Sequence, residues 1–177
     1  MNITVYLGAN EGNDPALATA VRELGRWIGE SGNALVYGGS KAGLMGELAV
    51  AALDAGAEVT GVEPEFFIRQ AAQLDTLTQL IVTPDIPTRR AKMIELGDAF
   101  IAFPGGTGTL EEVSEIMSGT SLGFIDAHCI IYNLNGYYDP LRALLDRMVD
   151  AGLSTPARLA KISFASSLDE IARVLSA

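Results

Sequence analysis

The sequence predicts an α/β protein with a Rossmann-like, doubly wound fold, in which about seven strands form a mainly parallel sheet with helices on both faces. Three observations lead to this prediction. Short apolar runs alternate with longer helical patterns along the chain, which is the order of β-α-β units. Most of these runs lack alternating polar residues, as expected for strands that helices cover on both sides. The length of 177 residues and the hydrophobic content of 49% suit one domain, residues 1–177, with one large core.

The expected strands are short and apolar, and they cover residues 3–7, 34–37, 58–62, 79–82, 99–103, 129–132 and 161–164. The expected helices lie near residues 15–30, 43–55, 65–74, 87–97, 109–121, 138–151 and 167–176. Ligands of such sheets bind at the carboxyl ends of the strands. The loops that we expect to carry function are therefore residues 8–13, 38–46, 84–90 and 104–112.

Charge and composition exclude several classes of partner. Twelve basic and 22 acidic residues give a net charge of −10. Such a surface repels phosphate backbones and anionic lipids, so we expect no nucleic acid and no membrane as partner. One Cys and one His exclude an internal disulfide and argue against a His/Cys zinc site, so no metal is expected. The single thiol, with no signal peptide and no apolar run of 18 residues, predicts a cytoplasmic protein.

The strongest functional signal is the segment Pro104-Gly105-Gly106-Thr107-Gly108-Thr109-Leu110-Glu111-Glu112, which follows one expected strand and opens a helix. Three glycines allow the backbone to approach a ligand closely and to point N–H groups at it. The helix N-terminus adds a partial positive charge, which favours a phosphate. The loop is neither a Walker A motif nor G-x-G-x-x-G, because an acid occupies the last position of the latter. We expect Gly105, Gly106, Thr107, Gly108 and Thr109 to bind phosphate.

The sequence around Glu112 allows two interpretations. Thr109 and Glu112 have the spacing of a capping box, and acids near a helix N-terminus are favoured by the helix dipole. Alternatively, the carboxylate contacts a sugar hydroxyl or a water molecule beside the bound phosphate. The sequence leaves both open.

Two further loops carry candidate residues. Gly39 and Ser40 follow the expected strand 34–37 and precede a helix, where a serine hydroxyl can bind a phosphate oxygen; a tight turn explains them equally well. Arg89 and Arg90 lie early in a helix, where cations oppose the dipole. Arginine there suits bidentate contact with phosphate or carboxylate, and the alternative is a solvated basic face.

Several motifs occur together in an order that is typical of one family: Tyr37-Gly38-Gly39, Gly43-Leu44-Met45-Gly46, Gly61-Val62-x-Pro64, Arg89, Pro104-Gly105-Gly106-x-Gly108-Thr109-x-x-Glu112 and Asn135-Gly136-Tyr137-Tyr138. This pattern resembles the cytokinin riboside 5′-monophosphate phosphoribohydrolases, the "Lonely guy" family, many of whose members carry the older label lysine decarboxylase-like. The resemblance covers about residues 2–152.

The resemblance implies an activity and a site. Members of the family hydrolyse the N-glycosidic bond of an adenine-type nucleoside 5′-monophosphate to the free base and ribose 5-phosphate, with no organic cofactor. It implies that Arg89 and Glu112 are catalytic, and that the glycine loop with Thr109 holds the phosphate of a small nucleotide substrate. It also implies a homodimer, and the high hydrophobic content agrees with an apolar helical interface.

The sequence departs from the family pattern at Ala9, Asn10, Pro87, Thr88, Arg90, Gly119 and Ser121. These departures leave the nucleobase open, and they support an alternative function: a non-catalytic carrier of a nucleotide or of another phosphate-containing cofactor. A pyridoxal phosphate-dependent decarboxylase, which the older label suggests, would need a lysine for its Schiff base. The chain offers only Lys41, Lys92 and Lys161.

Overall fold

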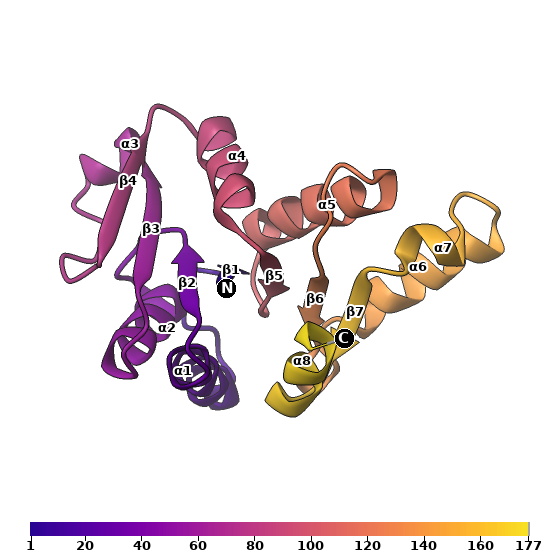
Figure 1. The fold of residues 1–177 in the computed structure, drawn as a ribbon, viewed down its shortest axis with the longest axis horizontal. Helices are drawn as coiled ribbons and strands as arrows, with labels where there is room; N and C mark the ends of the chain where they lie inside the picture. The colour runs from indigo at the N-terminus through magenta and orange to yellow at the C-terminus, as the bar shows by residue number, and fades with distance from the viewer. Residues whose placement is uncertain (177) are drawn as a thin grey trace.

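The computed structural model describes residues 1–176, and its strands form one seven-stranded sheet (Figure 1). The order across the sheet is β4-β3-β2-β1-β5-β6-β7, and every pairing between neighbouring strands is parallel. The predicted doubly wound parallel sheet is confirmed. The strands are β1 (Asn2–Tyr6), β2 (Ala34–Tyr37), β3 (Val59–Pro64), β4 (Gln79–Thr83), β5 (Ala99–Ala102), β6 (Cys129–Tyr132) and β7 (Ile162–Ala165).

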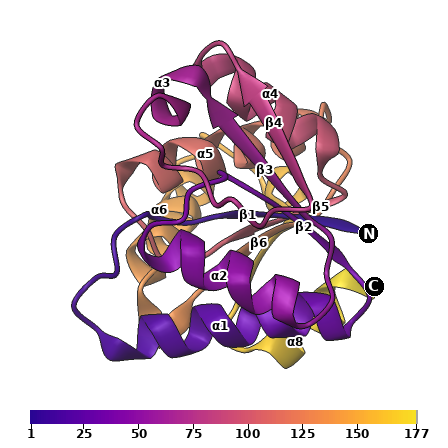
Figure 2. The ribbon, with the colours of Figure 1, turned by 90° about the vertical axis from the view of Figure 1, so that its left-hand side faces the viewer.

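Helices cover both faces of this sheet (Figures 1 and 2). One face packs against α1 (Pro15–Glu30), α2 (Gly43–Asp54) and α8 (Leu168–Leu175). The other face packs against α4 (Ile86–Leu96), α5 (Thr107–Leu122) and α6 (Asp139–Asp150). Two short helices, α3 (Glu65–Ile68) and α7 (Pro156–Leu159), complete the set in the part of the chain described.

The core has two layers because successive side chains of a strand point to opposite faces. In β1, Ile3 and Val5 are fully buried against α1 and α2. Tyr6 lies in the opposite layer, where it stacks on Phe100 of β5 with ring centroids 6.3 Å apart. Both layers are apolar, which explains why the sequence of these strands lacks polar alternation.

The connectivity creates a crevice at the centre of the sheet. From β1 the chain winds outward through β2 and β3 to the edge strand β4. Helix α4 then carries it back across the sheet to β5, which pairs with the other side of β1. The chain therefore leaves β1 toward α1 on one face of the sheet and leaves β5 toward α5 on the other, which makes a topological switch point, where ligands of open α/β sheets bind.

Three predictions about the helices need correction. The helix expected over residues 65–74 ends at Ile68. Ala71 then adopts a positive φ of 53°, and the following segment pairs with the second glycine loop, where Lys41 N donates to Ala72 O at 2.8 Å and Leu74 N to Gly39 O at 2.9 Å. These contacts take the backbone donors and acceptors away from a helix.

The helix expected from residue 109 begins two residues earlier, at Thr107. In the C-terminal third, the chain adds α7 and a short 3-10 turn over Leu134–Gly136 that the sequence pattern did not indicate. The earlier start of α5 changes the interpretation of Glu112, as described below.

Candidate active site

A cavity of about 330 Å³ opens at the carboxyl ends of β1 and β5. Its walls are the loop of residues 7–10 after β1 and the glycine segment of residues 106–109 after β5. The side chains of Met45, Phe67, Arg89 and Glu112 complete the lining. We call this space the first cavity. It lies where the strand order predicts a ligand.

The glycine loop after β5 has one glycine that is needed for packing and two that face open space. A Cβ on Gly105 would overlap the side chain of Thr109 and would lie 3.0 Å from the backbone nitrogen of Gly8. A Cβ on Gly106 or Gly108 would meet no heavy atom within 4 Å. The loops after β1 and β5 are therefore in close contact at Gly105, whereas Gly106 and Gly108 leave room for a ligand.

The N-terminus of α5 is open to an anion. Its N-cap is Gly106, which has no side chain to accept a hydrogen bond from the first turn. The first N–H groups of a helix lack partners inside the helix, and together with the dipole they favour a phosphate. Tyr137 holds the loop in place, because its hydroxyl donates to Gly105 O at 2.6 Å.

Arg89 and Glu112 form an ion pair in the lining of the first cavity. Arg89 Nη1 donates to Glu112 Oε1 at 3.0 Å, and Arg89 Nε donates to the carbonyl oxygen of Val62 at 3.0 Å. The side chains are only 14% and 10% exposed. The guanidinium is thus fixed by a strand end and by a carboxylate from α5, and both charged groups border the cavity.

Glu112 is not part of a capping box. Because α5 begins at Thr107 with Gly106 as its N-cap, Thr109 lies inside the first turn and Glu112 in the second. A capping-box acid belongs three residues after the N-cap, and that position is Thr109. The structure therefore removes the capping interpretation of Glu112 and leaves a buried carboxyl paired with Arg89.

Burial and the ion pair act in opposite directions on Glu112. Burial raises the pKa of the Glu112 carboxyl, and the Arg89 charge with its hydrogen bond opposes that rise. A carboxylate held by a guanidinium stays ionised more readily than a buried carboxyl without a partner. This is the state that can accept a proton or stabilise a positive charge.

The second glycine loop makes room for charged side chains. A Cβ on Gly38 would overlap Arg89 Nη2, and a Cβ on Gly39, whose φ is +88°, would lie 2.6 Å from Glu63 Oε2. Ser40 lies beside them, where its Oγ accepts a hydrogen bond from Ala42 N at 3.1 Å. Of the two candidates predicted in this loop, Gly39 therefore abuts a carboxyl group, and Ser40 lines the cavity described next.

A second cavity of about 260 Å³ adjoins the first. Its lining includes Gly38, Ser40, Glu63 and Ala72. The two cavities share four residues, Ala9, Met45, Phe67 and Arg89. Sequence analysis missed Glu63, and the available signal was a charged residue between Val62 and Pro64 in an otherwise uncharged strand.

Arg90 points to a different partner from its neighbour. Its guanidinium donates to Glu111 at 2.7 Å and to Glu115 at 2.9 Å, both on α5. Arg90 lines neither the first nor the second cavity. Two carboxylates hold the side chain between α4 and α5, so the structure does not bring Arg90 together with the other predicted phosphate-binding residues.

Apart from Arg90, the departures from the family pattern lie in three places. Ala9 and Asn10 line the first cavity. Pro87 and Thr88 form the first turn of α4, where Thr88 N donates to the Asp85 carboxylate at 2.8 Å. The remaining two, Gly119 and Ser121, lie in the last turn of α5, outside both cavities.

None of the three lysines lines either cavity. Lys41 is exposed, Lys92 pairs with Glu95 on α4, and Lys161 pairs with Asp126. Pyridoxal phosphate chemistry would need a lysine at the ligand.

Within residues 1–176 there is no group of three or more metal-ligating side chains. No helix in the same range is long and apolar enough to cross a membrane.

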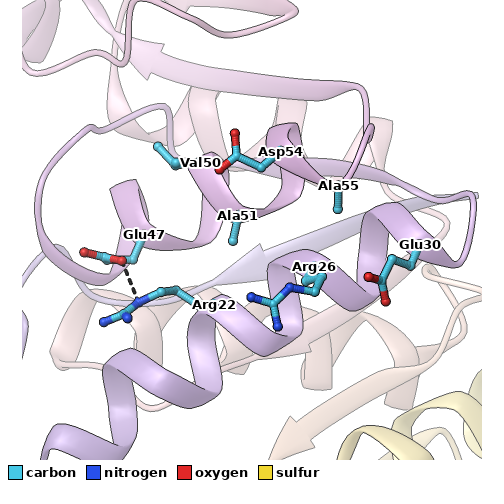
Figure 3. A pocket seen from close by; sticks show the side chains of 8 residues that line it. All are labelled: Arg22, Arg26, Glu30, Glu47, Val50, Ala51, Asp54 and Ala55. Carbon is cyan, nitrogen blue, oxygen red and sulfur yellow. Dashed lines mark ion pairs between the residues drawn. The ribbon is translucent and has the colours of Figure 1, made fainter.

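A hollow of about 240 Å³ lies elsewhere, between α1 and α2 (Figure 3). Its eight lining residues include Arg22, Arg26 and Glu47, and Arg22 Nε pairs with Glu47 Oε2 at 2.8 Å. Both side chains of this pair are about half exposed. The second half of α1 runs back toward the amino ends of the strands, so this hollow is not part of the site at their carboxyl ends.

Comparison with known proteins gives relatives over nearly the whole chain. A family model described as possible lysine decarboxylase matches residues 45–175. A cytokinin riboside 5′-monophosphate phosphoribohydrolase of Rhodococcoides fascians is 44% identical over 163 residues, which are 91% of this chain and 82% of that protein. A protein of the same name from Arabidopsis thaliana is 35% identical over 173 residues, 98% of this chain and 81% of the other.

Solved structures share the fold at lower identity. The molybdenum cofactor carrier protein of Chlamydomonas reinhardtii superposes with a TM-score of 0.72 at 20% identity, over 99% of this chain and 98% of that one. The molybdenum cofactor binding protein of Rippkaea orientalis gives 0.71 at 22% identity, over 99% and 94%. At such identities the likeness concerns the fold alone. By its match to the family model and its identity with relatives over most of both chains, this chain belongs to the family of cytokinin riboside 5′-monophosphate phosphoribohydrolases, within the group described as possible lysine decarboxylases.

Proposed function

We propose that this protein hydrolyses the N-glycosidic bond of an adenine or cytokinin nucleoside 5′-monophosphate and releases the free base and ribose 5-phosphate. One observation carries the proposal: a buried Arg89–Glu112 ion pair borders the same cavity as the uncapped N-terminus of α5. The names of the relatives agree with it.

The glycine loop would hold the 5′-phosphate. The backbone N–H groups of Gly106, Thr107 and Gly108 lie at the N-terminus of α5. Thr107 and Thr109, which carry hydroxyl groups, line the cavity. An α-helix rises about 1.5 Å per residue, so Glu112 lies roughly 9 Å along the axis from Gly106. A phosphate bound at Gly106 would therefore place the ribose beside Glu112. Binding energy at the phosphate would orient the sugar for reaction.

Glu112 would act on the reacting carbon. N-glycoside hydrolysis passes through a ribosyl centre with oxocarbenium character. An ionised carboxylate beside that centre stabilises the developing positive charge and takes a proton from the attacking water. Arg89 would fix the carboxylate through Nη1 and keep it ionised, and the same guanidinium borders the space where the ribose or phosphate would lie.

The test is base release from a nucleotide panel. Adenosine 5′-monophosphate and a cytokinin riboside 5′-monophosphate are incubated with the protein, and free base and ribose 5-phosphate are measured by chromatography. We expect equal amounts of both products. No base release from any nucleoside 5′-monophosphate would overturn the proposal.

The alternative is a carrier that binds a nucleotide or another phosphate-containing cofactor without cleaving it. The observation that favours it is that Ala9 and Asn10, which line the first cavity, depart from the family pattern while the glycine loop keeps it. A carrier would show nucleotide binding by calorimetry together with intact nucleotide after prolonged incubation. We prefer the enzyme because the buried ion pair places at the cavity a carboxylate that hydrolysis needs and that binding alone does not need.

A homodimer is part of the proposal. An apolar hollow of about 380 Å³ adjoins the glycine loop and is lined by Leu110, Tyr137, Pro140 and Leu141 among others. Leu110 and Tyr137 are 47% and 51% exposed. Apolar side chains gathered beside a site suit burial by a second copy.

We also keep the expectation of a cytoplasmic protein that binds neither nucleic acid nor membrane, which the net charge of −10 and the unpaired Cys129 support.

A further inference from the structure

Glu63 is a buried carboxyl that the mechanism above does not use. It lies near the carboxyl end of β3 and is 2% exposed. Its Oε2 atom has no hydrogen-bond partner among residues 1–176. Buried polar atoms are nearly always hydrogen-bonded, and burying an unpaired one is costly. An unpaired carboxyl oxygen at a cavity wall therefore indicates a partner that arrives with a ligand.

The position of Glu63 relates it to the proposed substrate. It lines the second cavity, which adjoins the first along Ala9, Met45, Phe67 and Arg89. The glycine loop lies on the first cavity and Glu63 on the second, with Arg89 bordering both. A nucleotide whose phosphate binds the glycine loop and whose ribose lies at Glu112 would extend its base into the second cavity.

The surroundings of Glu63 leave space for its carboxyl group, and the neighbouring cation is held by other partners. Gly39 leaves space for Oε2. Arg89 is the cation that lowers the pKa of Glu63, and its guanidinium already donates to Glu112 and to the carbonyl oxygen of Val62. The other titratable group that interacts with Glu63 is the phenol of Tyr37, whose hydroxyl donates to Ser40 O.

We propose that Glu63 is a second catalytic carboxyl, which donates a proton to the leaving purine-type base. This inference rests on the proposed function. In the step, the bond between C1′ and the base nitrogen breaks and its electron pair goes to the base. The proton of the Glu63 carboxyl passes to a base nitrogen, and the base departs neutral. Water adds to C1′ and gives one proton to Glu112. The solvent then returns one proton to Glu63 and removes one from Glu112.

The two carboxyls have the environments that such a division requires. Burial raises the pKa of Glu63 to about 7, with Arg89 opposing the rise, so a large fraction of this group is protonated at neutral pH. Glu112 carries a direct hydrogen bond from Arg89, which favours its ionised form. Burial raises the pKa of both carboxyls, but only Glu112 has a guanidinium bonded to it, and carboxyls in such different environments commonly divide acid and base roles.

The experiment varies the leaving group. Adenine needs a proton to depart as a neutral base, whereas 4-nitrophenolate departs without one. Wild-type protein and Glu63→Gln are assayed with adenosine 5′-monophosphate and with 4-nitrophenyl β-D-ribofuranoside 5-phosphate. Glutamine keeps the shape of the side chain and removes the acidic proton. Glu65→Gln is the matched control, because Glu65 is exposed on α3 and pairs with Arg69.

We expect Glu63→Gln to slow adenine release by about 10²-fold or more, the usual scale of a general acid. Release of 4-nitrophenolate should stay within about threefold of the wild type, since that leaving group needs no acid catalyst. Adenine release by the wild type should fall as the pH rises above about 7, and this limb should vanish in Glu63→Gln.

Two results overturn the assignment of Glu63 while the proposed function stands. One is wild-type adenine release by Glu63→Gln. The other is an equal loss with both substrates, which would show a structural role. If the wild type releases neither leaving group, the proposed function itself fails and Glu63 loses its role with it.

Discussion

Arg89 and Glu112 are 23 positions apart in the sequence and form an ion pair between α4 and α5, with Arg89 Nη1 3.0 Å from Glu112 Oε1. Their sequence neighbours, Arg90 and Glu111, form a second pair of 2.7 Å between the same helices. The inner pair is almost buried and borders the first cavity, whereas Glu111 is 59% exposed. Substitutions in the two pairs can therefore be compared directly. Both pairs join an arginine of α4 to a glutamate of α5, and only the inner pair borders the first cavity.

Glu112→Gln should separate chemistry from folding. Glutamine keeps the volume of the side chain but removes the charge that stabilises the ribosyl centre and accepts the proton. We expect base release to fall by about 10²-fold or more while nucleotide affinity, measured by calorimetry, is kept. Glu111→Gln is the control and should keep wild-type turnover. Equal losses in both variants would contradict the catalytic role of Glu112.

Arg89→Ala should weaken nucleotide binding and activity together. It removes a guanidinium from the cavity and leaves the buried Glu112 carboxylate without its partner. Charge-assisted hydrogen bonds contribute about 1.5–3 kcal/mol, so calorimetric affinity for adenosine 5′-monophosphate should fall by that amount. Arg90→Ala removes two surface pairs and should cost about 0–1 kcal/mol of stability with unchanged affinity. Loss of affinity in Arg90→Ala alone would reverse our assignment of the two arginines.

The glycines of the phosphate loop should differ when each is replaced by alanine. Gly106→Ala places a methyl group in open space, so thermal stability should stay near that of the wild type while phosphate binding is weakened. Gly105→Ala forces a Cβ against Thr109 and Gly8, and overpacking of this kind costs typically about 1–3 kcal/mol. Thermal unfolding and calorimetry on both variants check this contrast. A stable, fully binding Gly105→Ala would contradict the packing described here.

Glu63 should make stability depend on pH. Burial raises the pKa of its carboxyl from the ordinary 4.5 to about 7, so the folded state holds this proton more tightly than the unfolded state. The free energy of unfolding should therefore fall as the pH rises from about 4.5 to about 7. Glu63→Gln removes this loss, and above pH 7 it should be more stable than the wild type by up to about 3 kcal/mol. Urea unfolding at pH 4.5 and pH 8 measures the difference, and an equal effect at both values would contradict it.

Leu110 should report on the proposed dimer. Leu110→Asp places a charge in the apolar hollow beside the glycine loop and should convert a dimer into a monomer in light scattering at micromolar concentration. Leu153→Asp is the control, because Leu153 is 76% exposed outside that hollow. A wild-type protein that is already monomeric would end the dimer proposal.

The sequence alone predicted much of this protein because its strands are buried on both faces. Apolar runs such as Ala99–Ala102 in β5 have no polar alternation, and this pattern is typical of parallel strands between helices. The order of strands and helices then placed function at the strand ends. The glycine segment was visible for the same reason, since its residues are contiguous and their effect on the backbone is local.

Only the tertiary structure decided which partners the charged residues have. Arg89 and Arg90 look alike in the sequence, yet in the fold α4 lies beside α5 so that one contacts Glu112 at the cavity and the other contacts Glu111 and Glu115 outside it. The start of α5 at Thr107 removed Glu112 from a capping position, and the close approach of Gly39 to β3 brought Glu63 to the cavity. Contacts between distant segments depend on helix crossing and strand order, and no local pattern of residues encodes them.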